Sequence, residues 1–60
     1  TSKQQEALTL AFQEGYYELP RKIILESLAK EMNVGRRTFE EHLRKAERKI
    51  MAFLIPILKI

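Results

Sequence analysis

The chain lacks cysteine and has a single histidine, His42, among its 60 residues. Without cysteine, no disulfide and no thiolate metal site can stabilise the fold, and cysteine usage does not indicate the redox compartment. His42 has no second metal ligand and no nucleophile at a useful spacing. The two glycines form no phosphate-binding loop. We therefore expect no catalytic site, no metal and no cofactor, and we interpret His42 as a half-buried residue at the edge of a core.

Long apolar runs are also scarce. The most apolar stretch, from Ile50 to Ile60, contains Pro56 and Lys59, and it is shorter than the roughly 20 residues that span a bilayer. No signal peptide is visible, and the chain begins at Thr1 rather than at a methionine. We expect an excised domain or a trimmed chain, cytoplasmic and without membrane contact.

Strand-type alternation, internal repeats and low-complexity segments are absent as well, and apolar residues recur at helical spacing. Hydrophobic residues make up 45% of the chain and charged residues 32%, which is typical of a globular domain. A chain of this size buries only about 60% of the surface that its unfolded form exposes. Its stability must come from helix packing, and from a partner or self-association. The pattern predicts an all-α fold, a small three- to four-helix bundle.

Three helices are expected. In the first, one stripe consists of Ala7, Leu8, Ala11 and Phe12, whereas Leu10 lies off it. Gly15 ends the helix as its C-terminal cap. The second spans about 25–32 and begins without a side-chain cap. The third begins at about Arg36, runs straight or divides near 46–49, and should end before Pro56, because proline disfavours helical geometry in the preceding residue. The third helix is expected to bury Phe39, His42 or Leu43, Ala46, and then Ile50 or Phe53.

The segment Asn33-Val34-Gly35 interrupts the helical pattern between the second and third helices. Asparagine tolerates the left-handed conformation that closes a helix, and glycine can open the next one. Ala29, four residues earlier, is small enough for a second helix to pack closely. A supporting helix, a tight turn and a second helix with an exposed face are the parts of a helix-turn-helix. We predict this motif within a domain at 1–55, followed by an apolar tail at 56–60.

Positive charge is concentrated on the third helix. Residues 36–49 hold six basic and three acidic side chains, so their surplus equals the net charge of +3 of the whole chain. Concentrated positive charge on one helix suits a polyanion. The alternative is a solvated face with internal charge pairs. We predict that this segment is a recognition helix for the major groove of double-stranded DNA, with no small-molecule ligand.

The predicted contacts divide into two groups. Residues of the first turns face the bases, and arginine there can donate two hydrogen bonds to guanine. Basic residues further along, together with two in the preceding loop and one hydroxyl, are predicted to contact phosphates. Thr38 can alternatively cap the turn. The base-reading group is Arg36, Arg37, Glu40 and Glu41, and the phosphate group is Thr38, Arg44, Lys45, Arg48, Arg21 and Lys22.

The glutamates within this segment need a role, because carboxylates repel phosphates. They can accept a hydrogen bond from a cytosine amino group. They can also orient the basic residues, since Arg36–Glu40–Arg44 and Arg37–Glu41–Lys45 are both i, i+4 ladders. Exposed pairs of this kind contribute only about 0.2–0.5 kcal/mol each. We favour the orienting role.

These residues together resemble one family. The segments are Gln4–Leu8, Gly15–Arg21, Leu28–Ala29 and Thr38–Ile50, with a Gly-Tyr-aromatic…Pro-Arg loop and a His-Leu-Arg-x-Ala-Glu-x-Lys run. They are similar to the helix-turn-helix domain of the bacterio-opsin activator type, found in archaeal transcriptional regulators. A more distant likeness links the chain to region 4 of bacterial sigma factors and to LuxR-type regulators.

The resemblance implies a sequence-specific DNA-binding domain at the C-terminus of a longer regulator, without enzymatic activity. Two positions depart from the family pattern. Ile24 stands where the family usually has Thr or Ser, and Gly35 stands where it usually has Ser at the start of the recognition helix. Glycine costs little as a cap, but it removes a hydroxyl that can bond a phosphate. The competing interpretation is a protein-interaction module that keeps the fold without binding DNA.

The apolar tail predicts an assembly. Its side chains exceed what a core this small can bury, and a single recognition helix covers only half of a typical site. We predict a homodimer through the C-terminal segment; the alternative is a tail that folds back over the first helix and covers Leu10. The residues predicted to dimerise are Met51, Phe53, Leu54, Ile57 and Leu58.

Overall fold

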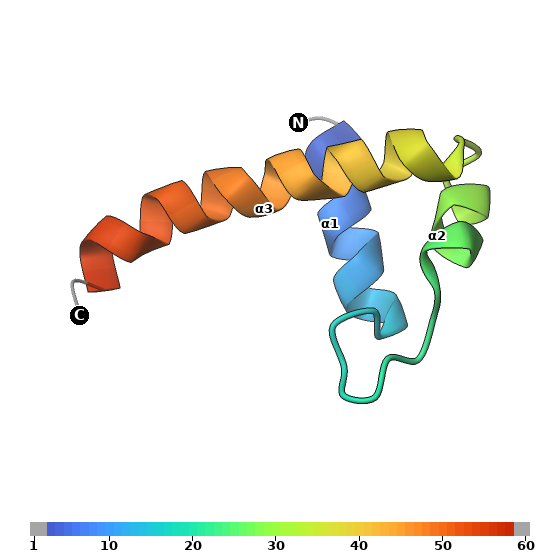
Figure 1. Ribbon diagram of the computed structural model, residues 1–60, viewed down its shortest axis with the longest axis horizontal. Helices are drawn as coiled ribbons and strands as arrows, with labels where there is room; N and C mark the ends of the chain where they lie inside the picture. Colours follow the sequence, from blue (N-terminus) through green and yellow to red (C-terminus); the bar gives the residue numbers. More distant parts are fainter. Residues whose placement is uncertain (1–2, 59–60) are drawn as a thin grey trace.

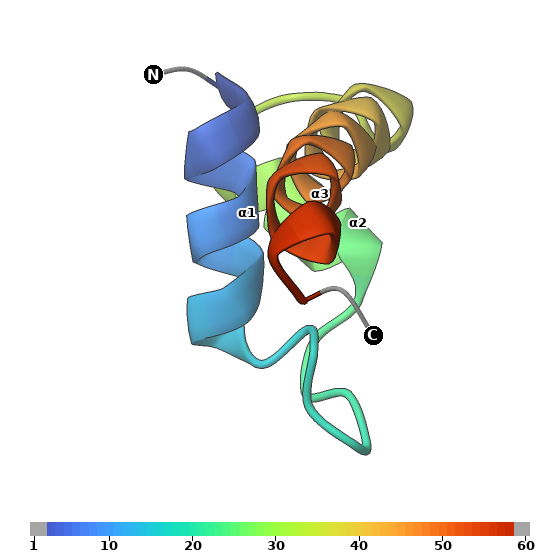
Figure 2. The same ribbon diagram turned by 90° about the vertical axis from the view of Figure 1, so that its left-hand side faces the viewer.

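The computed structural model describes residues 3–58 and consists, over that range, of three α-helices and no strand. The helices are α1 (Lys3–Glu14), α2 (Leu25–Glu31) and α3 (Arg36–Leu58). α3 crosses α1 and α2 and packs on both (Figure 1). Seen along α3, α1 lies on one side and α2 on the other (Figure 2). The predicted all-α fold is confirmed.

The core lies where the N-terminal half of α3 meets the other two helices. Phe39 and Leu28 are its largest fully buried side chains. Alanines on α1 and α2 allow the backbones to approach closely, so one phenylalanine and two leucines fill the space between three helices. The buried cluster consists of Ala7, Ala11, Leu28, Ala29, Phe39 and Leu43.

One expectation for α1 was wrong. Phe12 belongs to the predicted apolar stripe, yet its side chain is 68% exposed, whereas Ala7 and Ala11 are fully buried. The reason is the crossing of the helices: α3 covers the narrow strip of α1 at Ala7 and Ala11 and leaves Phe12 at the edge of the contact.

α1 and α2 end in the same way. Gly15 has φ +91° and Asn33 has φ +59°, so both reverse the chain in left-handed backbone geometry. The amide of Tyr16 donates to the carbonyl of Ala11 at 2.9 Å, and that of Val34 donates to the carbonyl of Ala29 at 3.0 Å. These are the six-to-one hydrogen bonds of Schellman motifs. In both motifs the next side chain, Tyr16 or Val34, packs against the core, so each helix end is anchored by an apolar contact.

α3 is longer than predicted. It is continuous from Arg36 to Leu58 and passes through Pro56, so the expectation that Pro56 ends the helix was wrong. Proline removes one amide donor and crowds the carbonyl four residues earlier. Here that carbonyl belongs to Ala52 in an exposed last stretch, where water can satisfy it. The division into a domain at 1–55 and a tail at 56–60 stays a prediction; residues 59 and 60 lie outside the described range.

The C-terminal half of α3 projects from the helical body rather than folding back over α1 (Figure 1). The radius of gyration is 12.2 Å, against about 10 Å for a compact domain of this length. Ile50 is 44% and Phe53 is 70% exposed, so the expectation that one of them continues the core was wrong. Neither α1 nor α2 reaches far enough along α3 to cover them.

Candidate nucleic-acid interface

The helix-turn-helix predicted from Asn33-Val34-Gly35 is present. α2 ends at Glu31, Asn33 turns the chain, and the carbonyl of Gly35 accepts the first hydrogen bond of α3 from the amide of Phe39 at 2.9 Å. The extended Ile24 precedes α2 and provides no side-chain cap, as expected. Because the turn is held at both ends by backbone hydrogen bonds and by Val34, it sets the direction in which α3 leaves α2.

The exposed face of α3 is basic. Phe39, Leu43 and Ala46 face the core, so side chains on the opposite side of the helix point to solvent. The row directly opposite the core follows the spacing i, i+4, i+7, i+11 and consists of Arg37, Glu41, Arg44 and Arg48, all exposed. Thr38 and Lys45 are exposed beside it, Glu40 is partly buried, and His42 is half-buried as predicted.

One rung of the predicted charge ladders is formed. Arg44 Nη2 lies 3.2 Å from Glu40 Oε2, with the two side chains 75% and 41% exposed. An ion pair this exposed contributes at most about 0.2–0.5 kcal/mol to stability. Its effect is geometric: Arg37, Glu40, Glu41 and Arg44 line one shallow hollow on α3, in which the glutamate holds the arginine along the helix surface.

The loop between α1 and α2 contributes a second basic element. Arg21 donates from Nε to the carbonyl of Tyr16 at 3.1 Å, and its guanidinium lies 4.3 Å from the centre of the Tyr16 ring. Arg21 and Lys22 line a hollow of about 360 Å³ together with Arg36 at the start of α3. The structure therefore brings together two residues predicted to contact phosphates and one predicted to contact bases.

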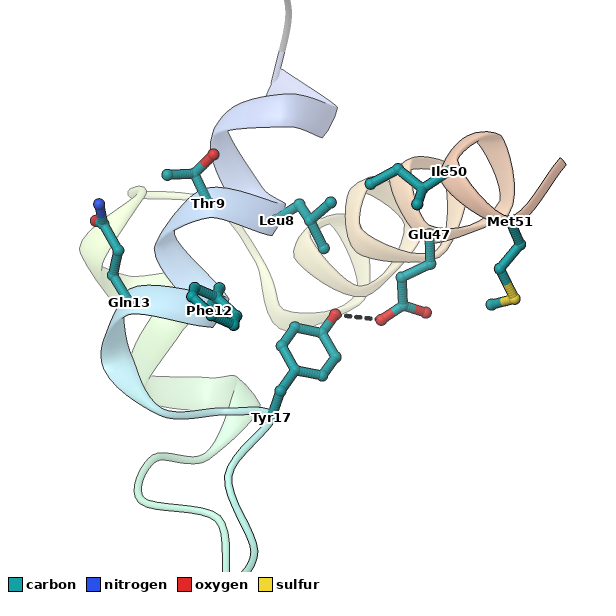
Figure 3. Close-up of a pocket in the computed structure, with 8 residues that line it drawn as sticks. All are labelled: Leu8, Thr9, Phe12, Gln13, Tyr17, Glu47, Ile50 and Met51. Atoms are coloured by element: carbon teal, nitrogen blue, oxygen red, sulfur yellow. Dashed lines mark hydrogen bonds between the residues drawn. The ribbon is translucent and has the colours of Figure 1, made fainter. Parts of the chain in front are cut away.

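A contact between the loop and α3 was not predicted from the sequence. Tyr17 donates a hydrogen bond from its hydroxyl to the carboxylate of Glu47, 30 residues away (Figure 3). Burial, followed by this hydrogen bond, raises the pKa of Tyr17 well above its usual value. Tyr16 packs edge-to-face on Tyr17, with ring centres 5.2 Å apart. No spacing rule relates residues so far apart in sequence.

An apolar groove opens where α1 and α3 diverge, beyond the core (Figure 3). Its volume is about 810 Å³. Leu8 and Phe12 from α1 and Ile50 and Met51 from α3 supply its apolar walls, and the Tyr17–Glu47 hydrogen bond closes one end.

Within residues 3–58, no helix is both long and apolar enough to cross a membrane. The same range contains no cluster of three side chains suited to hold a metal ion.

A three-helix domain with a helix-turn-helix and a basic third helix is the architecture of a DNA-binding domain. A family model described as "HTH DNA binding domain" matches residues 1–52. The chain belongs to this family, the helix-turn-helix domains of the bacterio-opsin activator type, as the resemblance implied.

Three relatives come from the archaeon Haloferax volcanii. The transcriptional regulator NarO is 33% identical over 57 residues, which is 95% of this chain and 27% of NarO. A dimethyl sulfoxide reductase transcriptional activator is 36% identical over 50 residues, 83% of this chain and 24% of that protein. A putative transcriptional regulator is 37% identical over 51 residues, 85% of this chain and 9% of that protein. The chain thus spans about a quarter or less of these relatives. No solved structure gives a significant match.

Proposed function

We propose that this chain is the sequence-specific DNA-binding domain of an archaeal transcription regulator and acts in the cytoplasm without catalysing a reaction. The observation that carries the proposal is the row of exposed arginines on α3 directly after the helix-turn-helix turn. The names of the relatives, all transcriptional regulators, support the regulatory role. Their greater length supports the proposal that this domain belongs to a longer chain.

In this proposal the N-terminal half of α3 enters the major groove. The first turns of a recognition helix lie deepest in the groove, so Arg37, Glu40 and Glu41 face base edges. Arg44, Lys45 and Arg48 follow as the helix leaves the groove and meet phosphates.

Arg36 has a different environment from Arg37. It shares the hollow with Arg21 and Lys22, and three cations around one hollow suit a backbone phosphate. Arg21 is well suited to this role because the Tyr16 ring and carbonyl restrain it before DNA binds. We therefore propose that Arg37 carries more of the base recognition than Arg36, and that Arg36 also contributes to holding the backbone.

The test compares Arg37→Ala with Lys45→Ala on an operator and on unrelated DNA. Arg37→Ala should cost about 1–3 kcal/mol of specific binding and relax the preference at one base position, because a bidentate contact to guanine is lost. Lys45→Ala should weaken binding to both DNAs evenly and reduce the slope of log K against log salt by about 1. Fluorescence anisotropy titrations at several salt concentrations measure both quantities.

Arg37→Lys is the matched control, because it keeps the charge and removes the planar fork that pairs with guanine. It should preserve the salt slope and lose specificity. Specific-to-nonspecific ratios unchanged in both Arg37 variants would show that α3 does not read the bases through this residue.

The second candidate function, a protein-interaction module, rests on the exposed apolar half of α3 and on the three glutamates among its basic residues. The two candidates separate in the same titrations. A protein-interaction module that does not recognise DNA should bind the operator and unrelated DNA with equal affinity, and only weakly at physiological salt.

A further inference from the structure

The C-terminal part of α3 is apolar on every side. Between Ile50 and Leu58 it carries no ionisable side chain. Its large apolar residues cover about 200° of the helix circumference, and Ala52 and Pro56 occupy the rest. A helix that is hydrophobic all round is normally buried. In this chain the segment projects away from α1 and α2, with all of its residues exposed (Figure 1). Its large exposed side chains are Ile50, Met51, Phe53, Leu54, Ile55, Ile57 and Leu58.

The groove between α1 and α3 is the concave counterpart of this projecting segment. Ile50 and Met51 belong both to its wall and to the start of the segment (Figure 3), so the two surfaces form one continuous apolar area. Phe12, 68% exposed, forms the opposite wall. The charged Glu47 lies at the closed end, engaged by Tyr17. Thr9 and Gln13 also line the groove, and its lining is otherwise apolar.

We propose that two copies of this chain form a two-fold dimer in which the segment 50–58 of each copy lies in the α1–α3 groove of the other. Antiparallel pairing of the two segments alone covers a single face of each helix. Insertion into the partner's groove covers the rest of this apolar arc, which spans about 200° and is too broad for one helix to cover. Because groove and segment belong to the same chain, each copy supplies both halves of the interface, as two-fold symmetry demands.

The exposed area supports a second copy as the occupant. The seven apolar side chains of the segment and Phe12 are 43–70% exposed. Together they present on the order of 800 Å², the area that each partner buries in a standard protein–protein interface. A closed pair of this kind leaves the basic face of α3 free, since that face ends at Arg48, before the segment 50–58 begins.

The first experiment is sedimentation of the 60-residue chain without DNA, so its result is independent of the proposed function. One chain has a mass of 7.1 kDa. At high micromolar concentration the parent should sediment with twice this mass. Phe53→Glu combined with Leu54→Glu should raise the dimer Kd by at least about 100-fold, because carboxylates would be buried without partners. Leu19→Glu changes a 96% exposed position outside the groove and the segment, so it should leave the dimer Kd unchanged.

The second experiment tests the groove by complementation. Phe12→Glu and Phe53→Lys should each be monomeric and keep the helical circular dichroism of the parent, because both positions are exposed in one copy. An equimolar mixture should form a heterodimer. In the groove of the Phe53→Lys copy, Phe12 then contacts Phe53 of the other copy, as in the parent. In the groove of the Phe12→Glu copy, the introduced glutamate contacts the introduced lysine.

Three results would overturn the proposal. A parent that is monomeric at high micromolar concentration shows that the segment does not bind a second copy. Open-ended growth beyond the dimer shows that the contact does not close. Dimers that persist in Phe12→Glu, or a mixture of the two variants that stays monomeric, show that the groove does not bind the segment of a second copy. The groove would then be free to bind another domain of a longer chain.

Discussion

Phe39→Ala should remove about a third or more of the free energy of unfolding. Phe39 is fully buried where α3 meets both other helices, and removing a buried phenylalanine costs about 3–5 kcal/mol through lost transfer energy and the cavity left behind. A domain of this size has a total stability of only about 3–9 kcal/mol. A thermal melt followed by circular dichroism at a fixed chain concentration measures the loss.

Two variants make this result specific. Phe39→Leu keeps most of the buried volume and should cost less than about 1.5 kcal/mol. Leu19→Ala removes a side chain that is 96% exposed and should change stability by less than about 0.5 kcal/mol. Because 1 kcal/mol shifts the midpoint of a small domain by about 4–8 °C, a shift below about 5 °C for Phe39→Ala would contradict the central position of this residue.

Gly15→Ala is the second change with a large expected effect. At φ +91° an L side chain is strained, and a Cβ atom would lie 2.9 Å from Cβ of Lys22. The loop cannot easily retreat, because the Gly15 carbonyl accepts hydrogen bonds from the amides of Glu18 and Lys22 at 3.2 and 3.0 Å. Strain and overpacking together should cost about 2–4 kcal/mol and lower the melting midpoint by more than about 10 °C.

The control for this prediction is the other glycine. A Cβ at Gly35 meets nothing within 4 Å, and its φ lies outside the left-handed range. Gly35→Ser should therefore raise the free energy of unfolding by about 0.5–1 kcal/mol, because serine caps the helix and restricts the unfolded chain. If Gly15→Ala and Gly35→Ser shift the melting midpoint equally, the left-handed turn at Gly15 is not what holds the loop.

Several features could be predicted from the sequence alone because their causes are local. Helical spacing locates the helices, and the start of α3 at Arg36 follows from the left-handed Asn33 and from Gly35. The core residues Phe39, Leu43 and Ala46 define one side of α3, so the exposed arginine row on the other side follows from helix geometry. Family membership rests on the same local motifs.

Other features depend on how the helices cross, and no local rule determines that. The crossing of α1 and α3 exposes Phe12, opens the groove and brings Tyr17 to Glu47. The path of the loop gathers Arg21 and Lys22 around Arg36. The sequence by itself thus determined the helices, the turn and the basic face, because hydrogen bonds and side-chain periodicity act within a few residues. Only the tertiary structure decided that α3 continues past Pro56 and leaves its apolar end uncovered, because α1 crosses α3 instead of running along it and α2 lies near the other end of α3 (Figure 1).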